Sequence, residues 1–144
     1  MALNPMDGST TAFMGILLAY AGDWERGCAI VERASQLNPN HPGWYHFAPF
    51  LNAYQKGDYT TALQFAVKID MPGYHLSLAA RAAALGQLGE FEPAKNQLTQ
   101  LLALRPDFAS SVRGELNKWY LPDLVEQWID GLRKAGLEIL ENQK

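Results

Sequence analysis

The chain has 144 residues, 48% of them hydrophobic, which is enough apolar surface for one compact domain with a buried core. Its net charge of −3, with acidic and basic residues interspersed, excludes the basic patches that bind nucleic acid or an anionic membrane surface. No apolar run reaches the ~18 residues of a membrane span, and the N-terminus lacks a signal-peptide pattern. Together with a single cysteine, Cys28, these features predict a soluble, cytoplasmic protein.

A glycine, an acidic residue and an aromatic residue recur three times, as Gly22-Asp23-Trp24, Gly57-Asp58-Tyr59 and Gly89-Glu90-Phe91. Prolines flank these copies at intervals of 34, 33 and 34 residues, at Pro5, Pro39, Pro72 and Pro106. Such a period indicates helix-turn-helix units stacked into a solenoid. We expect the aromatic residue of each copy to be buried within its own unit.

The first unit predicts two antiparallel helices. Apolar residues recur at helical spacing over residues 10–21, with Asp7 or Ser9 available as the N-cap. After the turn glycine, Asp23 can cap a second helix over residues 24–37.

The second unit, from about Pro42 to Ile69, has uneven halves. Its glycine-to-proline spacing predicts a second helix about half a turn shorter than that of the first unit. Pro49 falls within the expected first helix, which leaves two readings open: a kink at Pro49, or a helix that starts late.

The third unit is regular, with expected helices over residues 74–88 and 91–104, after which the period stops. Two further helices are expected at about 108–120, capped by Asp107 and burying Trp119 or Tyr120, and at about 122–136. We interpret these two as a cap over the last repeat. The predicted organisation is a single domain with repeats at about 8–41, 42–74 and 75–108.

The units resemble the tetratricopeptide repeat (TPR), whose pattern has a small residue in the middle of the first helix and a glycine at the turn. An aromatic residue follows two positions after that glycine, an alanine three positions later, and a proline at the end. The matching residues are Gly15, Gly22, Trp24, Gly27, Ala34 and Pro39; then Gly57, Tyr59, Ala62 and Pro72; then Ala82, Leu85, Gly89, Phe91, Ala94 and Pro106. The resemblance covers residues 1 to about 106. It implies an all-α, right-handed α-α superhelix, and leaves the ligand open because this repeat serves many functions.

The segment from Trp128 to Leu137 resembles the end of TPR regions in bacterial signalling proteins, notably those with a class III adenylate cyclase or a winged-helix regulatory domain upstream. The start, Ala2-Leu3-Asn4-Pro5, is similar to the last turn of an earlier repeat. These two resemblances imply a fragment of a longer bacterial protein whose output domain precedes these residues.

No arrangement of a nucleophile with a base is visible in the sequence, and the three histidines, His41, His46 and His75, lack the i, i+4 spacing of helical metal sites. We therefore expect no catalytic residues, no metal and no cofactor.

In the TPR resemblance, the first helix of each unit lines a concave groove, here apolar and aromatic. The ligand-groove candidates are Tyr20, Trp44, Phe47, Leu51, Tyr54, Leu76 and Gln87. Either an apolar peptide or partner helix lies in this groove, or the protein's own flanking segments fill it. The seam of Trp44, Phe47, Leu51 and Tyr54 could equally face the core.

The sequence thus predicts a non-catalytic protein-protein interaction scaffold whose partner is a protein or peptide, with no nucleic acid and no membrane. An alternative is the regulatory C-terminal module of a bacterial signalling enzyme or transcriptional regulator, with its own N-terminal domain as the partner. The oligomeric state is left open.

Overall fold

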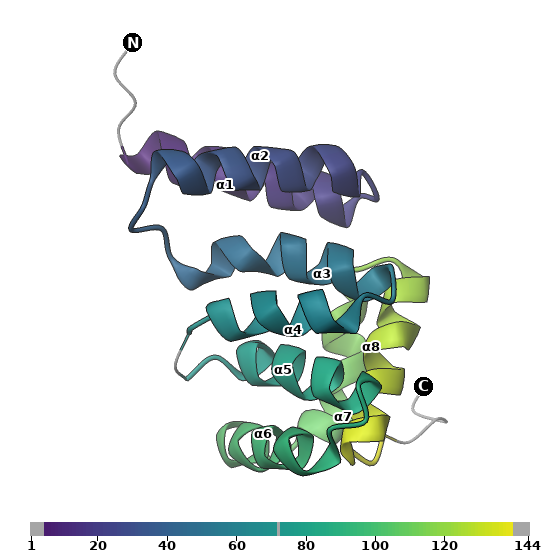
Figure 1. The fold of residues 1–144 in the computed structure, drawn as a ribbon. Helices are drawn as coiled ribbons and strands as arrows, with labels where there is room; N and C mark the ends of the chain where they lie inside the picture. The colour runs from purple at the N-terminus through teal and green to yellow at the C-terminus, as the bar shows by residue number, and fades with distance from the viewer. Residues whose placement is uncertain (1–4, 72, 140–144) are drawn as a thin grey trace.

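The computed structural model describes residues 5–71 and 73–139 of the chain. Within those ranges the protein is all-α, with no strand, so the predicted all-α solenoid is confirmed (Figure 1). The elements are α1 (Pro5–Tyr20), α2 (Trp24–Leu37), a 3₁₀ helix η1 (Gly43–His46), α3 (Phe47–Gln55), α4 (Tyr59–Lys68), α5 (His75–Gln87), α6 (Phe91–Leu104), α7 (Phe108–Asn117) and α8 (Pro122–Ala135). Residues 2–4, which belong to the segment similar to the end of an earlier repeat, and Pro72 lie outside the described ranges.

The turns between paired helices follow the sequence pattern. Gly22 adopts φ 110°, a left-handed conformation that ends α1 and that larger residues avoid. The Asp23 side chain then accepts a hydrogen bond from Arg26 N at 3.4 Å, and Asp58 caps α4 in the same way through Thr61 N at 3.3 Å. Glu90 stands at the equivalent position of α6 without a side-chain cap bond, because glutamate is a poorer N-cap than aspartate.

The first helix begins earlier than expected. It already includes Pro5, the first residue that the structure describes, so Asp7 and Ser9 lie inside α1 and neither is its N-cap.

In the second unit the first helix starts late and is not kinked at Pro49. Its backbone enters through the short η1, and Pro49 is the third residue of α3, where no intrahelical N–H bond is lost. The helix α4 has 10 residues against 14 in α2. It is therefore shorter, as predicted, but by about one turn and not half a turn.

Burial of the repeated aromatic residue was predicted for all three units and is wrong for the third. Trp24 and Tyr59 are half-buried and pack against the core, whereas Phe91 is 58% exposed and belongs to neither core cluster. The Tyr59 ring lies 5.2 Å from that of Tyr54, and its hydroxyl accepts a hydrogen bond from Gln127 of α8. Phe91 lies on the last repeat, which no further repeat covers (Figure 1).

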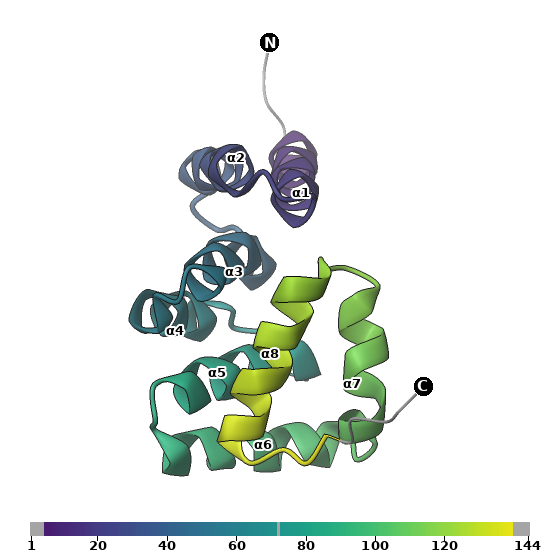
Figure 2. The ribbon, with the colours of Figure 1, turned by 90° about the vertical axis from the view of Figure 1, so that its right-hand side faces the viewer.

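The last two helices do not simply extend the stack. Figure 2 shows α8 crossing the inner side of the solenoid, past α5, with the α7–α8 turn close to α1. Helix α8 contacts α5 far more extensively than it contacts α6. The expected cover over the last repeat is therefore mainly a cover over the inner face of α5.

Small residues allow α8 to approach α5 closely. A Cβ at Gly86 would lie 2.8 Å from the backbone nitrogen of Ala135 and would also meet the carbonyl oxygen of Gly131. The facing surface of α5 is built from alanines such as Ala79 and Ala83, both fully buried. Backbone-to-backbone packing of this kind needs small side chains at the crossing, which explains the composition of α5.

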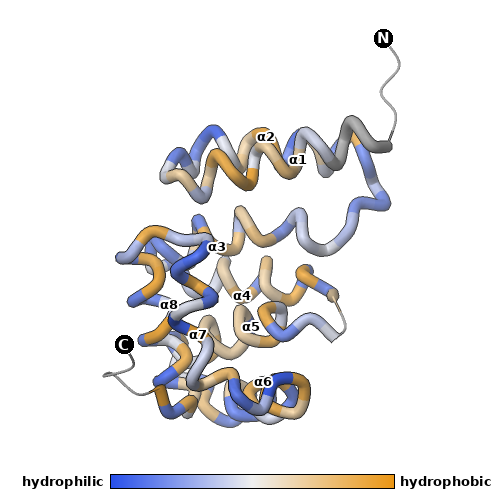
Figure 3. The backbone as a smooth tube through the Cα atoms, turned by 180° about the vertical axis from the view of Figure 1, so that it is seen from behind, coloured by the Kyte–Doolittle hydropathy of each residue, from blue (hydrophilic) through white to orange (hydrophobic). Residues whose placement is uncertain are grey.

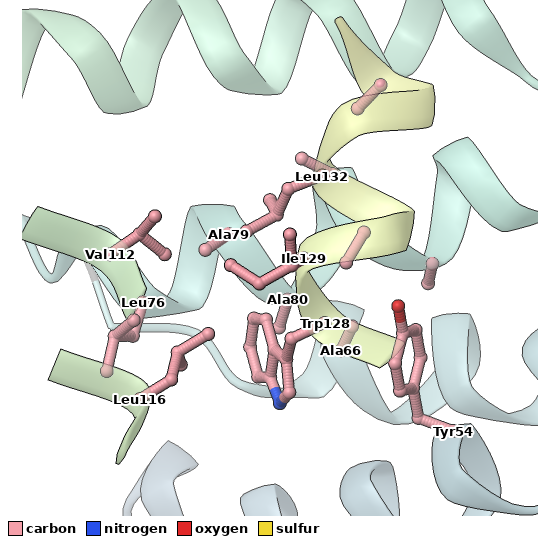
Figure 4. Close-up of a cluster of buried hydrophobic side chains, with 14 of the residues drawn as sticks. Tyr54, Ala66, Leu76, Ala79, Ala80, Val112, Leu116, Trp128, Ile129 and Leu132 are labelled. Carbon is pink, nitrogen blue, oxygen red and sulfur yellow. The ribbon is translucent and has the colours of Figure 1, made fainter. Parts of the chain in front are cut away.

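Two hydrophobic clusters share the fold, and hydrophobic and hydrophilic residues alternate along the helices that enclose them (Figure 3). The larger cluster joins α3 to α8, and Trp128, Ile129 and Leu132 of α8 are fully buried in it (Figure 4). The smaller one lies between α1, α2 and the start of the second unit. Three partly buried aromatics pack against both clusters: Tyr20, Trp24 and Trp44.

The α5–α8 contact makes a prediction about Gly131. Its added Cβ would lie 2.8 Å from the Ala83 carbonyl oxygen and would clash with the Tyr54 hydroxyl, so Gly131→Ala should destabilise the fold by ~1–3 kcal/mol through overpacking. Gly114→Ala is the matched control, because Gly114 is a helical glycine with open space around its Cβ position. That control should be neutral or more stable by up to ~1 kcal/mol in chemical denaturation. Equal effects of the two substitutions would contradict the close packing of α8.

Candidate functional site

Part of the predicted groove is filled by α8. Leu51 and Tyr54 are fully buried, and the Tyr54 ring lies beside α8 (Figure 4). The Tyr54 hydroxyl donates a hydrogen bond of 2.7 Å to the carbonyl oxygen of Gln127 in α8. The Tyr54 ring lies 6.1 Å from that of Trp128. Tyr54 thus contacts the protein's own helix α8, and neither Tyr54 nor Leu51 is accessible to a ligand.

Gln87 also serves this internal contact. Its side-chain nitrogen donates to the Tyr54 hydroxyl at 3.2 Å and to Asp130 at 3.2 Å, and its oxygen accepts from Lys134 at 2.9 Å. Burial raises the pKa of Tyr54, so its hydroxyl stays protonated and can donate to α8. Two of the seven candidates, Tyr54 and Gln87, therefore hold α8 in place, and a third, Leu51, is part of the core.

The other four candidates surround a cavity of about 320 Å³ at the end of the groove that α8 leaves open. We call it the aromatic pocket. Its walls come from α1, the start of the second unit, the start of α5 and the α7–α8 turn. The lining residues are Phe13, Ile16, Leu17, Tyr20, Trp44, Phe47, Met71, Tyr74, Leu76, Trp119 and Tyr120.

The pocket walls are neutral and rich in rings. The Tyr20 and Tyr120 rings meet edge to face at 5.0 Å, and those of Phe47 and Tyr74 do so at 6.1 Å. The pKa values of Tyr20 and Tyr120 are both raised, mainly by burial. Both hydroxyls therefore stay protonated at neutral pH. A pocket of this kind binds by burying apolar surface and is poorly suited to acid-base chemistry.

The rim of the pocket exposes large apolar side chains. Phe13 is 53% exposed, Leu17 45% and Trp119 54%, and all three line the cavity. Leu121, also 53% exposed, lies beside Gly22 at the same end of the solenoid. Contiguous exposed apolar groups on a folded protein mark an interaction site more often than a solvated surface.

Sequence reasoning missed the contribution of the α7–α8 turn. We expected Trp119 or Tyr120 on the buried face of α7. In the structure Tyr120 is buried and Trp119 is exposed. Because α7 ends at Asn117, both residues belong to the turn, and the turn carries them to α1. The adjacent pair of aromatics at a helix end was the available signal.

The histidines and the cysteine are not among the residues that line the pocket, although the His75 ring lies 5.4 Å from that of Tyr74. His41 and His46, five positions apart, meet with 3.2 Å between their Nε2 atoms, because the connection into η1 folds one back on the other. The described residues contain no group of three side chains that could hold a metal ion. Burial raises the pKa of the Cys28 thiol to about 11, so that thiol is a poor nucleophile at neutral pH.

These features, antiparallel helix pairs with capped glycine turns and an inner groove, define a TPR-like helical solenoid. A solved structure of a TPR-containing protein, MamA MSR-1 C2, has a similar fold with a TM-score of 0.60. The two sequences are 22% identical over a match that covers 90% of this chain and 75% of that one. No known protein family and no curated protein matches the sequence. At this identity the likeness establishes the fold.

None of the helices in the described ranges is both long and apolar enough to span a membrane.

The two kinds of aromatic position predict different mutational effects. Tyr54→Ala should destabilise the protein by ~3–5 kcal/mol, because it removes a fully buried ring and the hydrogen bond to α8. Trp119→Ala, at an exposed rim position, should change the free energy of unfolding by less than ~0.5 kcal/mol. Urea denaturation of both variants measures the difference, and a loss at Trp119 as large as that at Tyr54 would place Trp119 in the core.

The lowered pKa of His46 predicts that the stability of the fold depends on pH. Burial lowers this pKa most, and positive charge on His41 and Lys68 lowers it further. Between this lowered pKa and the unfolded value of ~6.5, the unfolded chain binds more protons, so stability declines as pH falls through that window. His46→Gln should therefore show a smaller drop in Tm between about pH 7 and about pH 5 than the wild type does. An unchanged drop would mean that His46 does not control this titration.

Proposed function

We propose that the chain is a non-catalytic protein-interaction scaffold that binds an apolar peptide or partner helix at the aromatic pocket. The observation that carries this proposal is an uncharged, ring-lined cavity of about 320 Å³ whose rim residues Phe13, Leu17 and Trp119 are about half exposed. The TPR-like neighbour supports a scaffold role in general.

The energetics favour a small number of anchor contacts. A partner that covers the rim would bury surface on several aromatic rings, each offering ~150–250 Å² in total. At ~25 cal/mol per Å² of apolar surface, one well-buried ring contributes a few kcal/mol, and aromatic residues of this kind dominate binding interfaces. The rim is therefore where we expect most of the binding energy.

The geometry favours a helical partner. Phe13, Leu17 and Tyr20 follow one another at spacings of four and three residues, so they form a stripe along one face of α1. Trp119 stands across the pocket on the α7–α8 turn. An amphipathic helix lying along the stripe can insert one apolar side chain between α1 and Trp119, as in other helix-in-groove complexes.

The alternative of a regulatory module in a bacterial signalling protein draws on the segment from Trp128 to Leu137. In the structure Trp128, Gly131 and Leu132 are buried between α8 and the repeats, where packing alone requires them. They add no weight to that alternative. A partner domain in the same polypeptide would use the same pocket.

The proposal is tested by selecting binders from a library of displayed peptides and measuring their affinity for variants. Selected peptides should carry apolar residues at i, i+3 or i+4, and Leu17→Ser or Trp119→Ala should weaken them by ~10-fold or more. Leu37→Ser is the matched control, because Leu37 is a helical leucine at least as exposed as Leu17 but lies outside the pocket lining. Binders that lose as much affinity with Leu37→Ser, or none with the rim variants, would rule the pocket out as the binding surface.

A further inference from the structure

The aromatic pocket has a second property besides its apolar character. Seven of its eleven lining residues are aromatic: Phe13, Tyr20, Trp44, Phe47, Tyr74, Trp119 and Tyr120. None of the eleven is charged. Ring faces carry negative potential, so a group of rings without a competing lysine or arginine attracts a cation.

One carboxylate acts on two of these rings. Glu115 of α7 raises the pKa of Tyr74, after the larger effect of burial, and it also contributes to the raised pKa of Tyr120. Both tyrosines line the pocket. Glu115 therefore contributes negative charge behind this wall of the pocket.

That carboxylate is only partly compensated. One oxygen of Glu115 accepts a hydrogen bond from His75 Nε2 at 2.7 Å. Its Oε1 atom is buried and has no hydrogen-bond partner in the part of the chain that the structure describes. The nearest arginine in this cluster, Arg105, approaches His75 Nε2 with its Nη1 atom at 3.3 Å and Asp107 with its Nε atom at 3.5 Å.

We propose that the aromatic pocket binds a quaternary ammonium group, presented as a trimethylated lysine side chain of the partner peptide. This inference rests on the proposed function, in which a peptide covers the rim, and it names the anchor that enters the pocket. The peptide origin follows from the continuity between the cavity and the exposed stripe of Phe13 and Leu17.

Methylation decides which cation fits. A bare ammonium or a guanidinium would lose its water on entering a pocket whose polar groups are few, and unreplaced hydrogen bonds of a buried charge are costly. A trimethylammonium group donates no hydrogen bonds and presents methyl groups to the rings, so it gains from apolar burial and from the ring charge together. The pocket therefore discriminates trimethyllysine from lysine.

The test compares three related small-molecule probes. They are Nα-acetyl-trimethyllysine amide, Nα-acetyl-lysine amide, and the neutral carbon isostere in which a tert-butyl group replaces the trimethylammonium. Affinities are measured by NMR titration of the whole chain, following the indole N–H signals of Trp44 and Trp119. Trimethyllysine should bind about fivefold or more tightly than the isostere and than lysine, given a cation–π contribution of ~1 kcal/mol or more.

Two variants separate charge from shape. Glu115→Gln keeps an acceptor for His75 but removes the negative charge, and it should reduce the preference for trimethyllysine over the isostere. Glu92→Gln, an exposed charge change on α6, is the control and should leave that preference unchanged.

Isostere binding equal to or tighter than trimethyllysine overturns this inference and leaves the apolar pocket of the proposed function intact. Absence of binding by all three probes overturns it as well, and the peptide selection then decides the proposed function separately. Free choline serves as a further probe: if it binds at least tenfold more tightly than trimethyllysine amide, the ligand is a small cation and the peptide source is wrong.

Discussion

The close crossing of α8 over α5 determines where this protein can bind anything. Gly86 and Gly131 bring the two backbones into contact, and Tyr54 reaches over from α3 to donate a hydrogen bond to Gln127 of α8. With α8 held there, the inner half of the groove is closed. The same arrangement brings the α7–α8 turn against α1, where the Tyr120 ring meets that of Tyr20, and so creates one wall of the aromatic pocket.

The pocket lies where two hydrophobic clusters meet. The N-terminal pair, α1 and α2, has its own small cluster, and Gly15 and Gly27 let its helices pack closely. Tyr20 and Trp44 pack against both clusters and also line the pocket. A ligand in the pocket would therefore contact both parts of the core, and binding should stabilise the position of α1 relative to the rest of the solenoid.

Local chemistry made much of the fold predictable from sequence. The turn after α1 could be predicted because Gly22 and Asp23 determine it within a few residues, and Pro122 and Gly136 bound α8 in the same local way. The path of α8 could not be predicted, because it depends on small residues of α5 and α8 matching across 40 or more positions in the sequence. For that reason the sequence could not separate the groove candidates that line the pocket, such as Tyr20 and Trp44, from those that face α8, such as Tyr54.

The central claim, that α8 closes the inner groove and leaves the aromatic pocket open, is tested most directly by the solvent exposure of the four tryptophans. The protein labelled with 5-fluorotryptophan gives one ¹⁹F signal for each, assigned by single tryptophan-to-phenylalanine substitutions. A soluble gadolinium chelate should broaden the signal of Trp119, which is 54% exposed, and leave that of fully buried Trp128 sharp. Comparable broadening of both signals would show that α8 does not lie in the groove, and the account of the pocket would fail with it.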